Sequence, residues 1–179
     1  MCDGVLSEVR VSNEDVWHAS AFDEFVSREF DQVLALALAV LRDDDDALEV
    51  AQETMARVFE RWHDIAKLDR PGAWSRRVAL NLVTDKLRRR SRRRRLQARL
   101  AAEPHPVSNE SSAESWDDAF WSEVAALPRR QRDVTVLHYV LDLAVAEIAV
   151  IVQAPEGTVK SDLSRARDRL RARLVGDES

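Results

Sequence analysis

Apolar residues recur at intervals of three and four along most of this chain, a spacing that favours amphipathic helices. One apolar stripe covers residues 22–41, a second covers residues 48–62 and a third covers residues 74–87. The alternation of apolar and polar residues that is typical of a strand is not sustained anywhere. With only 4 Gly and 5 Pro among 179 residues, the sequence predicts an all-α fold.

Residues that favour helix ends mark where these helices should begin. The run from Asp43 to Asp46 suits the N-terminus of the second helix, because carboxylates accept hydrogen bonds from free backbone amides and favour the positive end of the helix dipole. Pro71 suits the first residue of the third helix, since its φ angle is already helical. We expect a loop between them, from His63 to Arg70.

The apolar pattern fails between residues 96 and 115, where two prolines and a polar cluster interrupt it. Such a segment is typical of a flexible linker. We therefore expect two small helical domains joined by this linker, an N-terminal one at residues 1–95 and a C-terminal one at residues 116–179.

Several classes of protein are excluded at this stage. The longest apolar run, from Val33 to Leu41, is far shorter than the roughly 20 residues that span a bilayer. Residues 1–16 contain four acidic side chains where a secretory signal would need a basic and then an apolar stretch, so we expect a cytoplasmic protein. Cys2 is the only cysteine and the four histidines are scattered. We therefore expect no metal site, no cofactor and no enzyme activity.

Charge is divided sharply along the chain. Residues 1–64 hold sixteen acidic residues against five basic ones, whereas residues 76–99 hold eleven basic residues against Asp85 alone. The tract from Arg88 to Arg95 either forms a solvated helix end or binds phosphate or an acidic partner, and composition alone does not decide between them. The helix that precedes it carries aromatic, basic and amide side chains, a mixture that suits nucleic acid.

The C-terminal domain contains a helix-turn-helix pattern. Breaks at Pro128, residues 141–143 and Pro155 divide this domain into four predicted helices, and residues 146–167 form a short apolar helix, a turn and a second helix. Polar residues at the start of the second helix should face the DNA major groove, and arginines that follow should reach phosphates. A helical hairpin that contacts only protein is the alternative.

Four motifs resemble the extracytoplasmic-function (ECF) sigma factors of the sigma-70 class. Residues 46–55 read DALEVAQETM and residues 73–90 read AWSRRVALNLVTDKLRRR, similar to the family patterns DAEDLVQETF and AWLYRIARNLALDLLRR. Residues 127–134 read LPRRQRDV and precede the helix-turn-helix, again as in the family. The resemblance covers about residues 20–174.

The resemblance implies a dissociable specificity subunit of bacterial RNA polymerase, with a region 2-like helical bundle and a region 4-like helix-turn-helix domain. Its partners would be the polymerase core, promoter DNA and an anti-sigma protein. The polymerase-binding residues would be Glu49, Gln52 and Glu53. The residues for the −10 promoter element would be Lys67, Arg70, Trp74, Arg76, Arg77, Asn81, Asp85, Arg88 and Arg89. The residues for the −35 element would be Glu156, Gly157, Thr158, Lys160, Ser161, Ser164, Arg165 and Arg167.

Three positions depart from the family pattern. Gln153 replaces the usual glycine of the turn, so it must accept a left-handed backbone or form another turn. Asp162 replaces an arginine, so it must either face away from DNA or read a cytosine amine. Leu48 and Glu49 stand where Glu and Asp are commoner, which keeps one acid and removes another.

Two other functions stay open from the residues alone. A sigma-like protein that has lost polymerase binding would act as a DNA-bound regulator or a decoy, and a basic RNA-binding protein would use the same arginine tract. The acidic and amide face of Glu49, Gln52 and Glu53 argues against both, because neither DNA nor RNA requires it.

Overall fold

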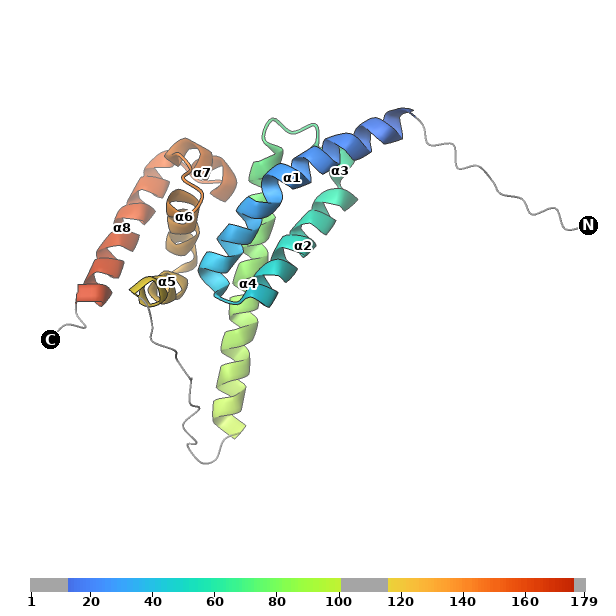
Figure 1. Ribbon diagram of the computed structural model, residues 1–179. Coiled ribbons are helices and arrows are strands. Elements are labelled where there is room, and N and C mark those ends of the chain that lie inside the picture. Colours follow the sequence, from blue (N-terminus) through green and yellow to red (C-terminus); the bar gives the residue numbers. More distant parts are fainter. Residues whose placement is uncertain (1–12, 101–115, 176–179) are drawn as a thin grey trace, which may run out of the picture.

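The computed structural model describes residues 13–100 and 116–175, and every regular element in those two ranges is a helix (Figure 1). The prediction of an all-α fold is confirmed. The helices are α1 (Asn13–Leu41), α2 (Asp44–Glu60), α3 (Trp62–Ile65), α4 (Pro71–Leu100), α5 (Trp116–Ala126), α6 (Arg129–Tyr139), α7 (Val145–Val152) and α8 (Glu156–Val175).

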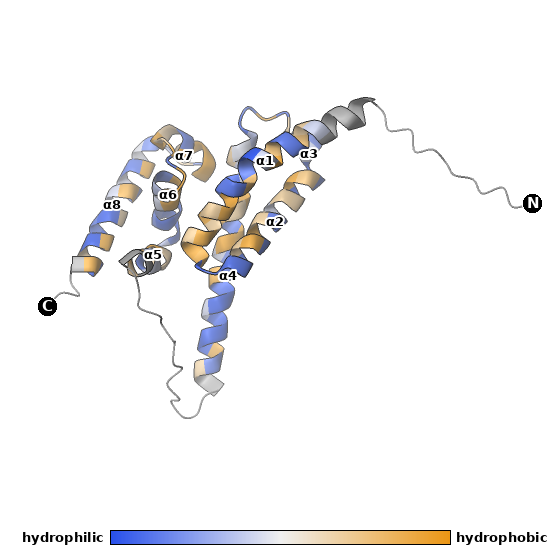
Figure 2. Cartoon of the chain, viewed as in Figure 1, coloured by the Kyte–Doolittle hydropathy of each residue, from blue (hydrophilic) through white to orange (hydrophobic). Residues whose placement is uncertain are grey.

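The three long N-terminal helices, α1, α2 and α4, pack against one another (Figure 1). Each contributes fully buried apolar side chains to the space between them, among them Leu36 from α1, Val50 from α2 and Val83 from α4. The opposite faces of these helices are largely hydrophilic, and hydrophilic residues predominate at the far end of α4 (Figure 2). The apolar stripes read from the sequence are therefore the faces that these helices bury.

Two predicted helix starts are confirmed. The side chain of Asp43 caps α2 by accepting a hydrogen bond of 2.8 Å from the backbone amide of Asp46, and three aspartates occupy the first turn. Pro71 is the first residue of α4. Both starts follow from chemistry local to the helix end, so they could be read without knowledge of the tertiary structure.

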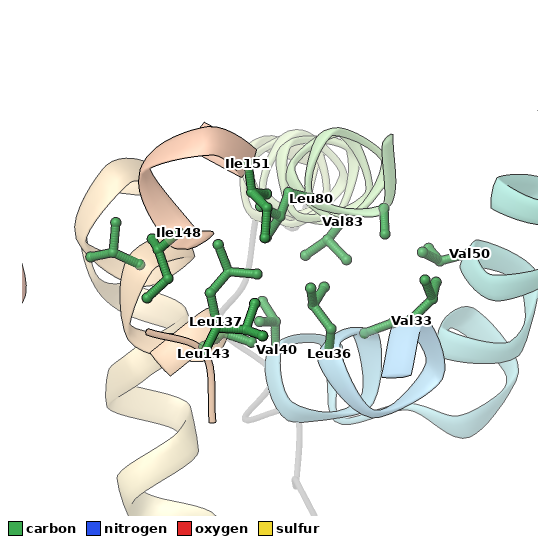
Figure 3. Close-up of a cluster of buried hydrophobic side chains, with 14 of the residues drawn as sticks. Val33, Leu36, Val40, Val50, Leu80, Val83, Leu137, Leu143, Ile148 and Ile151 are labelled. Atoms are coloured by element: carbon green, nitrogen blue, oxygen red, sulfur yellow. The ribbon is translucent and has the colours of Figure 1, made fainter. Parts of the chain in front are cut away.

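The C-terminal helices share an apolar core with the N-terminal ones. Figure 3 shows Ile151 of α7 beside Leu80 of α4, and Leu137 and Leu143 beside Val40 of α1. All five side chains are at most 9% exposed. The two groups of helices are thus held together by buried apolar contact, which the prediction of two domains on a flexible linker did not include.

The structure corrects two predicted boundaries. The predicted loop from His63 to Arg70 begins with a helical turn, α3, because residues 62–65 continue the helical hydrogen bonding after the break at Arg61. α4 continues to Leu100, beyond the predicted start of the linker at residue 96, because arginine, leucine, glutamine and alanine all favour helix there. Residues 101–115 of the predicted linker, like Cys2, lie outside the described residues.

A buried ion pair joins α1 to the start of α4. The Glu29 side chain is 6% exposed and lies 3.0 Å from the Arg76 guanidinium, which also donates a hydrogen bond to Gln32. Gly72 lies against the same carboxylate, because a Cβ added at this position would be 2.6 Å from Glu29 Oε1. The glycine is therefore needed for the close approach of α4 to Glu29.

We expect Gly72→Ala to lower the free energy of unfolding by about 1–3 kcal/mol, since Glu29 is held by Arg76 and has little room to yield. Gly157 is the matched control. It is also the second residue of its helix, and a Cβ there meets no atom within 4 Å. Urea unfolding followed by circular dichroism measures both variants, and equal effects of the two substitutions would contradict the steric account.

Candidate nucleic-acid and partner interfaces

The helix-turn-helix predicted from residues 146–167 is formed by α7, a short turn and α8. Ile148 of α7 and Val159 and Leu163 of α8 are buried between the two helices and the rest of the C-terminal part. Gln153 ends α7 with φ 51° and ψ 55°, so it adopts the left-handed backbone that the missing glycine would favour. The turn geometry of the motif is kept despite the substitution.

We expect Gln153→Gly to raise the free energy of unfolding by about 0.5–1 kcal/mol, because a side chain in the left-handed region is strained and glycine removes that strain. The same change in the middle of an exposed helical face, Gln52→Gly in α2, should lower it by about 1 kcal/mol. Thermal unfolding shows whether the first variant is more stable and the second less stable than the unmodified protein. A loss of stability in both variants would rule out strain at the turn.

The first turns of α8 present polar side chains to solvent. Of the residues predicted for the −35 element, Thr158 is half-buried and the other seven are exposed. Four of them, Gly157, Lys160, Ser161 and Ser164, recur at helical spacing and so share one face. The arrangement gives the start of α8 a polar, exposed face, which is what entry into a groove requires.

Asp162 does not belong to this strip. It is 7% exposed, and its carboxylate lies 3.3 Å from the Arg130 guanidinium of α6. The side chain thus faces the interior of the C-terminal part, and it neither repels phosphate nor reads a base. Two later arginines of α8 are also engaged within the protein, because Arg169 donates to Gln131 and Arg173 to Glu123.

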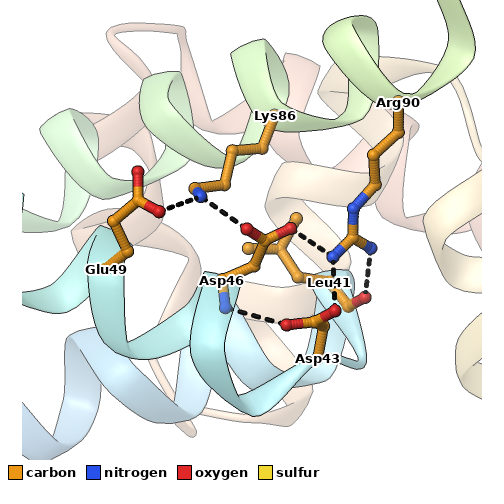
Figure 4. Close-up of polar contacts among 6 residues, drawn as sticks. All are labelled: Leu41, Asp43, Asp46, Glu49, Lys86 and Arg90. Carbon is orange, nitrogen blue, oxygen red and sulfur yellow. Dashed lines mark hydrogen bonds and ion pairs between the residues drawn. The ribbon is translucent and has the colours of Figure 1, made fainter. Parts of the chain in front are cut away.

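The face of α2 with Glu49, Gln52 and Glu53 is exposed, as its residue spacing predicts. Glu49 is 69% exposed at its side chain and accepts a bond of 2.8 Å from Lys86 of α4 (Figure 4). Glu53 pairs with Arg57 one turn later. The face therefore carries acidic groups that stay accessible although each already has one basic partner.

Two basic residues of α4 hold the start of α2 in place (Figure 4). Lys86 Nζ lies 2.6 Å from Asp46, and the Arg90 guanidinium contacts Asp43, Asp46 and the backbone carbonyl of Leu41. Neither role could be predicted from the sequence, because ion pairs between separate helices leave no signal in residue spacing. They fix the helix that carries the acidic face.

The hydrogen bond from Lys86, followed by the bond and charge of Arg90, lowers the pKa of Asp46 below 3.8 although partial burial opposes this. Asp46 therefore contributes stability above pH 3.8, and this stability is lost as the pH falls through the lowered value. We expect Asp46→Asn to cost about 1–2 kcal/mol at pH 7 and almost nothing near pH 2. Urea titrations at the two pH values measure the difference, and a constant cost would contradict the account.

Three of the nine residues predicted for the −10 element line a pocket at the start of α4. The pocket has a volume of about 440 Å³, and Arg70, Trp74 and Arg77 line it together with Val150 of α7. Trp74 is half-buried. Lys67 lies at the preceding turn, where it is exposed and bonded to His63. An aromatic wall with two guanidiniums is suited to an unstacked base and its phosphate.

The rest of the −10 residues have different surroundings. Asn81 is exposed, and its carbonyl oxygen accepts a 2.6 Å hydrogen bond from Arg129 of α6. Asp85, Arg88 and Arg89 are exposed further along α4, with Asp85 and Arg88 3.7 Å apart. Arg76 differs from all of these, because its side chain is 13% exposed and bound to Glu29. Its position assigns it to the packing of α1 against α4.

Comparison with known proteins decides the family. The model of sigma-70 region 2 matches residues 25–93, and that of sigma-70 region 4 matches residues 117–170. The RNA polymerase sigma-E factor of Streptomyces coelicolor is 33% identical over 155 residues, which are 86% of each chain. The chain belongs to the RNA polymerase sigma factors of the sigma-70 family. This sigma factor is of the ECF type, and it acts in transcription initiation and is not an enzyme.

Other relatives agree with this assignment. The ECF sigma factor SigW of Bacillus subtilis is 26% identical over 186 residues, 94% of each chain. Two solved structures share the fold. One is the sigma factor RpoE in complex with the anti-sigma factor NepR from Bartonella quintana, with a TM-score of 0.64, 22% identity and coverage of 89% of this chain and 99% of that one. The other is CnrH in complex with the cytosolic domain of CnrY, with a TM-score of 0.60, 23% identity and coverage of 92% and 96%.

Two further findings concern residues 13–100 and 116–175. None of the helices there combines the length and the apolar character that crossing a membrane requires. Nor do those residues contain a group of three or more His, Cys, Asp or Glu side chains placed to hold a metal ion.

Proposed function

We propose that this sigma factor docks on the polymerase core through the α2 face of Glu49, Gln52 and Glu53. The exposure of all three side chains supports this role. Two large apolar side chains of the same helix, Leu48 and Phe59, are 41% and 66% exposed. Acidic groups interspersed with exposed apolar side chains are suited to a basic, partly apolar protein surface.

We propose that the pocket of Arg70, Trp74 and Arg77 captures an unstacked base of the −10 element. Its volume of about 440 Å³ is within the range of small-molecule sites, so one base fits. Stacking on an aromatic side chain contributes about 1–3 kcal/mol per base, which offsets an unstacking cost of a few kcal/mol. Asn81, Asp85, Arg88 and Arg89 would continue this contact along α4, and Lys67 would contact it from the preceding turn.

The −35 element would be read by the exposed start of α8. Lys160, Ser161 and Ser164 share its outer face and would contact bases or phosphates, with Glu156, Gly157 and Thr158 at the helix start. Arg165 and Arg167 follow on exposed positions and would bind phosphate. Asp162 lies outside this contact set, because it is buried against Arg130.

Regulation by an anti-sigma protein is part of the same proposal. One solved structure of similar fold is a sigma factor in complex with an anti-sigma factor, and the other is CnrH in complex with the cytosolic domain of CnrY. We place this sigma factor in the cytoplasm, where the polymerase is found, with an anti-sigma partner that covers the α2 face or the promoter-binding helices.

The pocket that Trp74 lines together with two arginines is the single observation that carries the promoter role. The test uses the holoenzyme assembled from core polymerase and this chain, with 2-aminopurine placed along the non-template strand of a promoter fragment. We expect fluorescence to rise at one −10 position and Trp74→Ala to remove that rise while core binding is kept. An unchanged signal in the variant would contradict the base-capture role.

A further inference from the structure

A groove of about 890 Å³ lies between α4 and the helices α5 and α6, and all of its ionisable lining residues are arginines. Arg88, Arg94 and Arg95 reach it from α4, and Arg129 and Arg132 from α6. The remaining lining consists of Arg42, Arg90, and apolar or hydroxyl-bearing side chains. The groove therefore combines positive charge from both halves of the protein.

Carboxylates outside the groove neutralise only part of this charge. Asp133 pairs with both Arg129 and Arg132, at 3.5 and 3.2 Å. Arg90 is engaged by the aspartates at the start of α2. Within the described residues, Arg94 and Arg95 have no carboxylate oxygen within 4.0 Å, and both are exposed. An excess of positive charge therefore remains at the end of the groove formed by α4.

Arg132, a buried lining residue of the groove, lies close enough to other arginines to be affected by their positive charge. The side chain is 6% exposed, and its Nη2 donates to Thr84 and Asp133 while its Nε is buried without an acceptor. Burial lowers the pKa of Arg132, Asp133 opposes this, and the charges of Arg129 and Arg88 add to the lowering. A bound anion would offset this repulsion.

We propose that this groove binds a small polyphosphate, and that the ligand bridges α4 and α6. Guanidinium groups form paired hydrogen bonds with phosphate oxygens, so several arginines on two helices match a chain of phosphates better than a single anion. The volume is within the range of sites for nucleotide-sized molecules, and of the residues proposed above for promoter contact only Arg88 also lines the groove. The inference does not depend on those promoter contacts.

Calorimetric titration of the full chain, without polymerase or DNA, tests the site with inorganic tripolyphosphate, ATP and sulfate as probes. We expect tripolyphosphate to bind at least about 10-fold more tightly than sulfate. If ATP binds more tightly than tripolyphosphate, a nucleotide is the better ligand, and equal affinities indicate that the phosphate chain alone is recognised. Failure of both tripolyphosphate and ATP to bind would overturn the proposal.

A pair of matched double variants locates the binding. Arg94→Ala with Arg95→Ala removes two arginines of the groove, and Arg92→Ala with Arg93→Ala removes two arginines of the same helix that do not line it. We expect about a 10-fold or greater loss of tripolyphosphate affinity for the first and less than about 3-fold for the second, because only the first removes charged hydrogen-bond donors from the groove. Equal losses would mean unspecific attraction to the arginine tract and would overturn the site.

A single variant in α6 tests whether the ligand also contacts that helix. Arg129→Ala removes an exposed arginine of α6 from the groove, and thermal unfolding without ligand shows whether it folds normally. We expect a loss of tripolyphosphate affinity of about 10-fold for this variant as well. Full affinity in a folded Arg129→Ala protein would overturn the bridging of the two helices.

Discussion

Reversing the charge of the α2 face, with Glu49→Lys and Glu53→Lys, is expected to weaken binding to the polymerase core by at least about 30-fold, the effect of losing roughly 2 kcal/mol at an interface. Both side chains are exposed, Glu49 is paired with Lys86 of α4, and Glu53 is paired with Arg57. In the proposed docking, the substituted lysines would face the basic polymerase surface in place of two carboxylates. Co-elution with core polymerase on gel filtration, and the dissociation constant from fluorescence anisotropy, measure the change.

The control reverses the same number of charges elsewhere. Glu24 and Asp31 are exposed on α1, so Glu24→Lys with Asp31→Lys changes the net charge equally. We expect this variant to bind the core within about 3-fold of the unmodified protein, since surface charges outside an interface contribute little. Thermal unfolding checks that the loss of the Lys86 bond has not unfolded the first variant. Comparable weakening by both variants would contradict a specific α2 interface.

Asp133→Asn is expected to lower the free energy of unfolding by about 3–5 kcal/mol, the largest effect on stability that the structure suggests. Asp133 is 8% exposed at its side chain and pairs with the equally buried Arg132 and with Arg129. Burial raises the pKa of Asp133 above 3.8 even though both arginines oppose this. Loss of its charge would leave the Arg132 guanidinium buried without a carboxylate. Urea unfolding of the two proteins at pH 7 measures this.

Two further variants separate the ion pair from other causes. Asp85→Asn alters an exposed pair with Arg88, and we expect it to cost less than about 1 kcal/mol. Adding Arg132→Met to Asp133→Asn removes the stranded charge, so the double variant should be more stable than Asp133→Asn alone. If the double variant is instead the less stable of the two, the cost comes from packing and not from an uncompensated charge.

The helices and the helix-turn-helix could be predicted because their signals are local. The three- and four-residue period of apolar positions predicted which helix faces are buried. Pro71 and the run of aspartates at the start of α2 predicted where two helices begin. Gln153 shows where a local rule needs the structure, because its side chain alone did not decide between a left-handed residue and another turn. In the structure, Gln153 adopts the left-handed backbone conformation.

Contacts between distant helices could not be predicted in this way. Periodicity shows that Leu80 and Ile151 are core residues but not that they bury each other across the two halves. Similarly, Arg76 and Asp162 are polar residues in motifs that suggested DNA, and both face inward because Glu29 and Arg130 lie beside them. Only the tertiary arrangement identifies such partners, so residue spacing could not show that these two side chains are engaged within the protein.

As a sigma factor, this chain directs RNA polymerase to promoters. This function is tested by transcription with purified core polymerase, free of other sigma factors, on fragmented genomic DNA with the purified chain added and the transcripts sequenced. We expect new starts that share −10 and −35 elements, and we expect these starts to be lost when Glu49→Lys and Glu53→Lys are present together. If core polymerase gains no promoter-specific start from the folded chain, the chain does not act as a sigma factor.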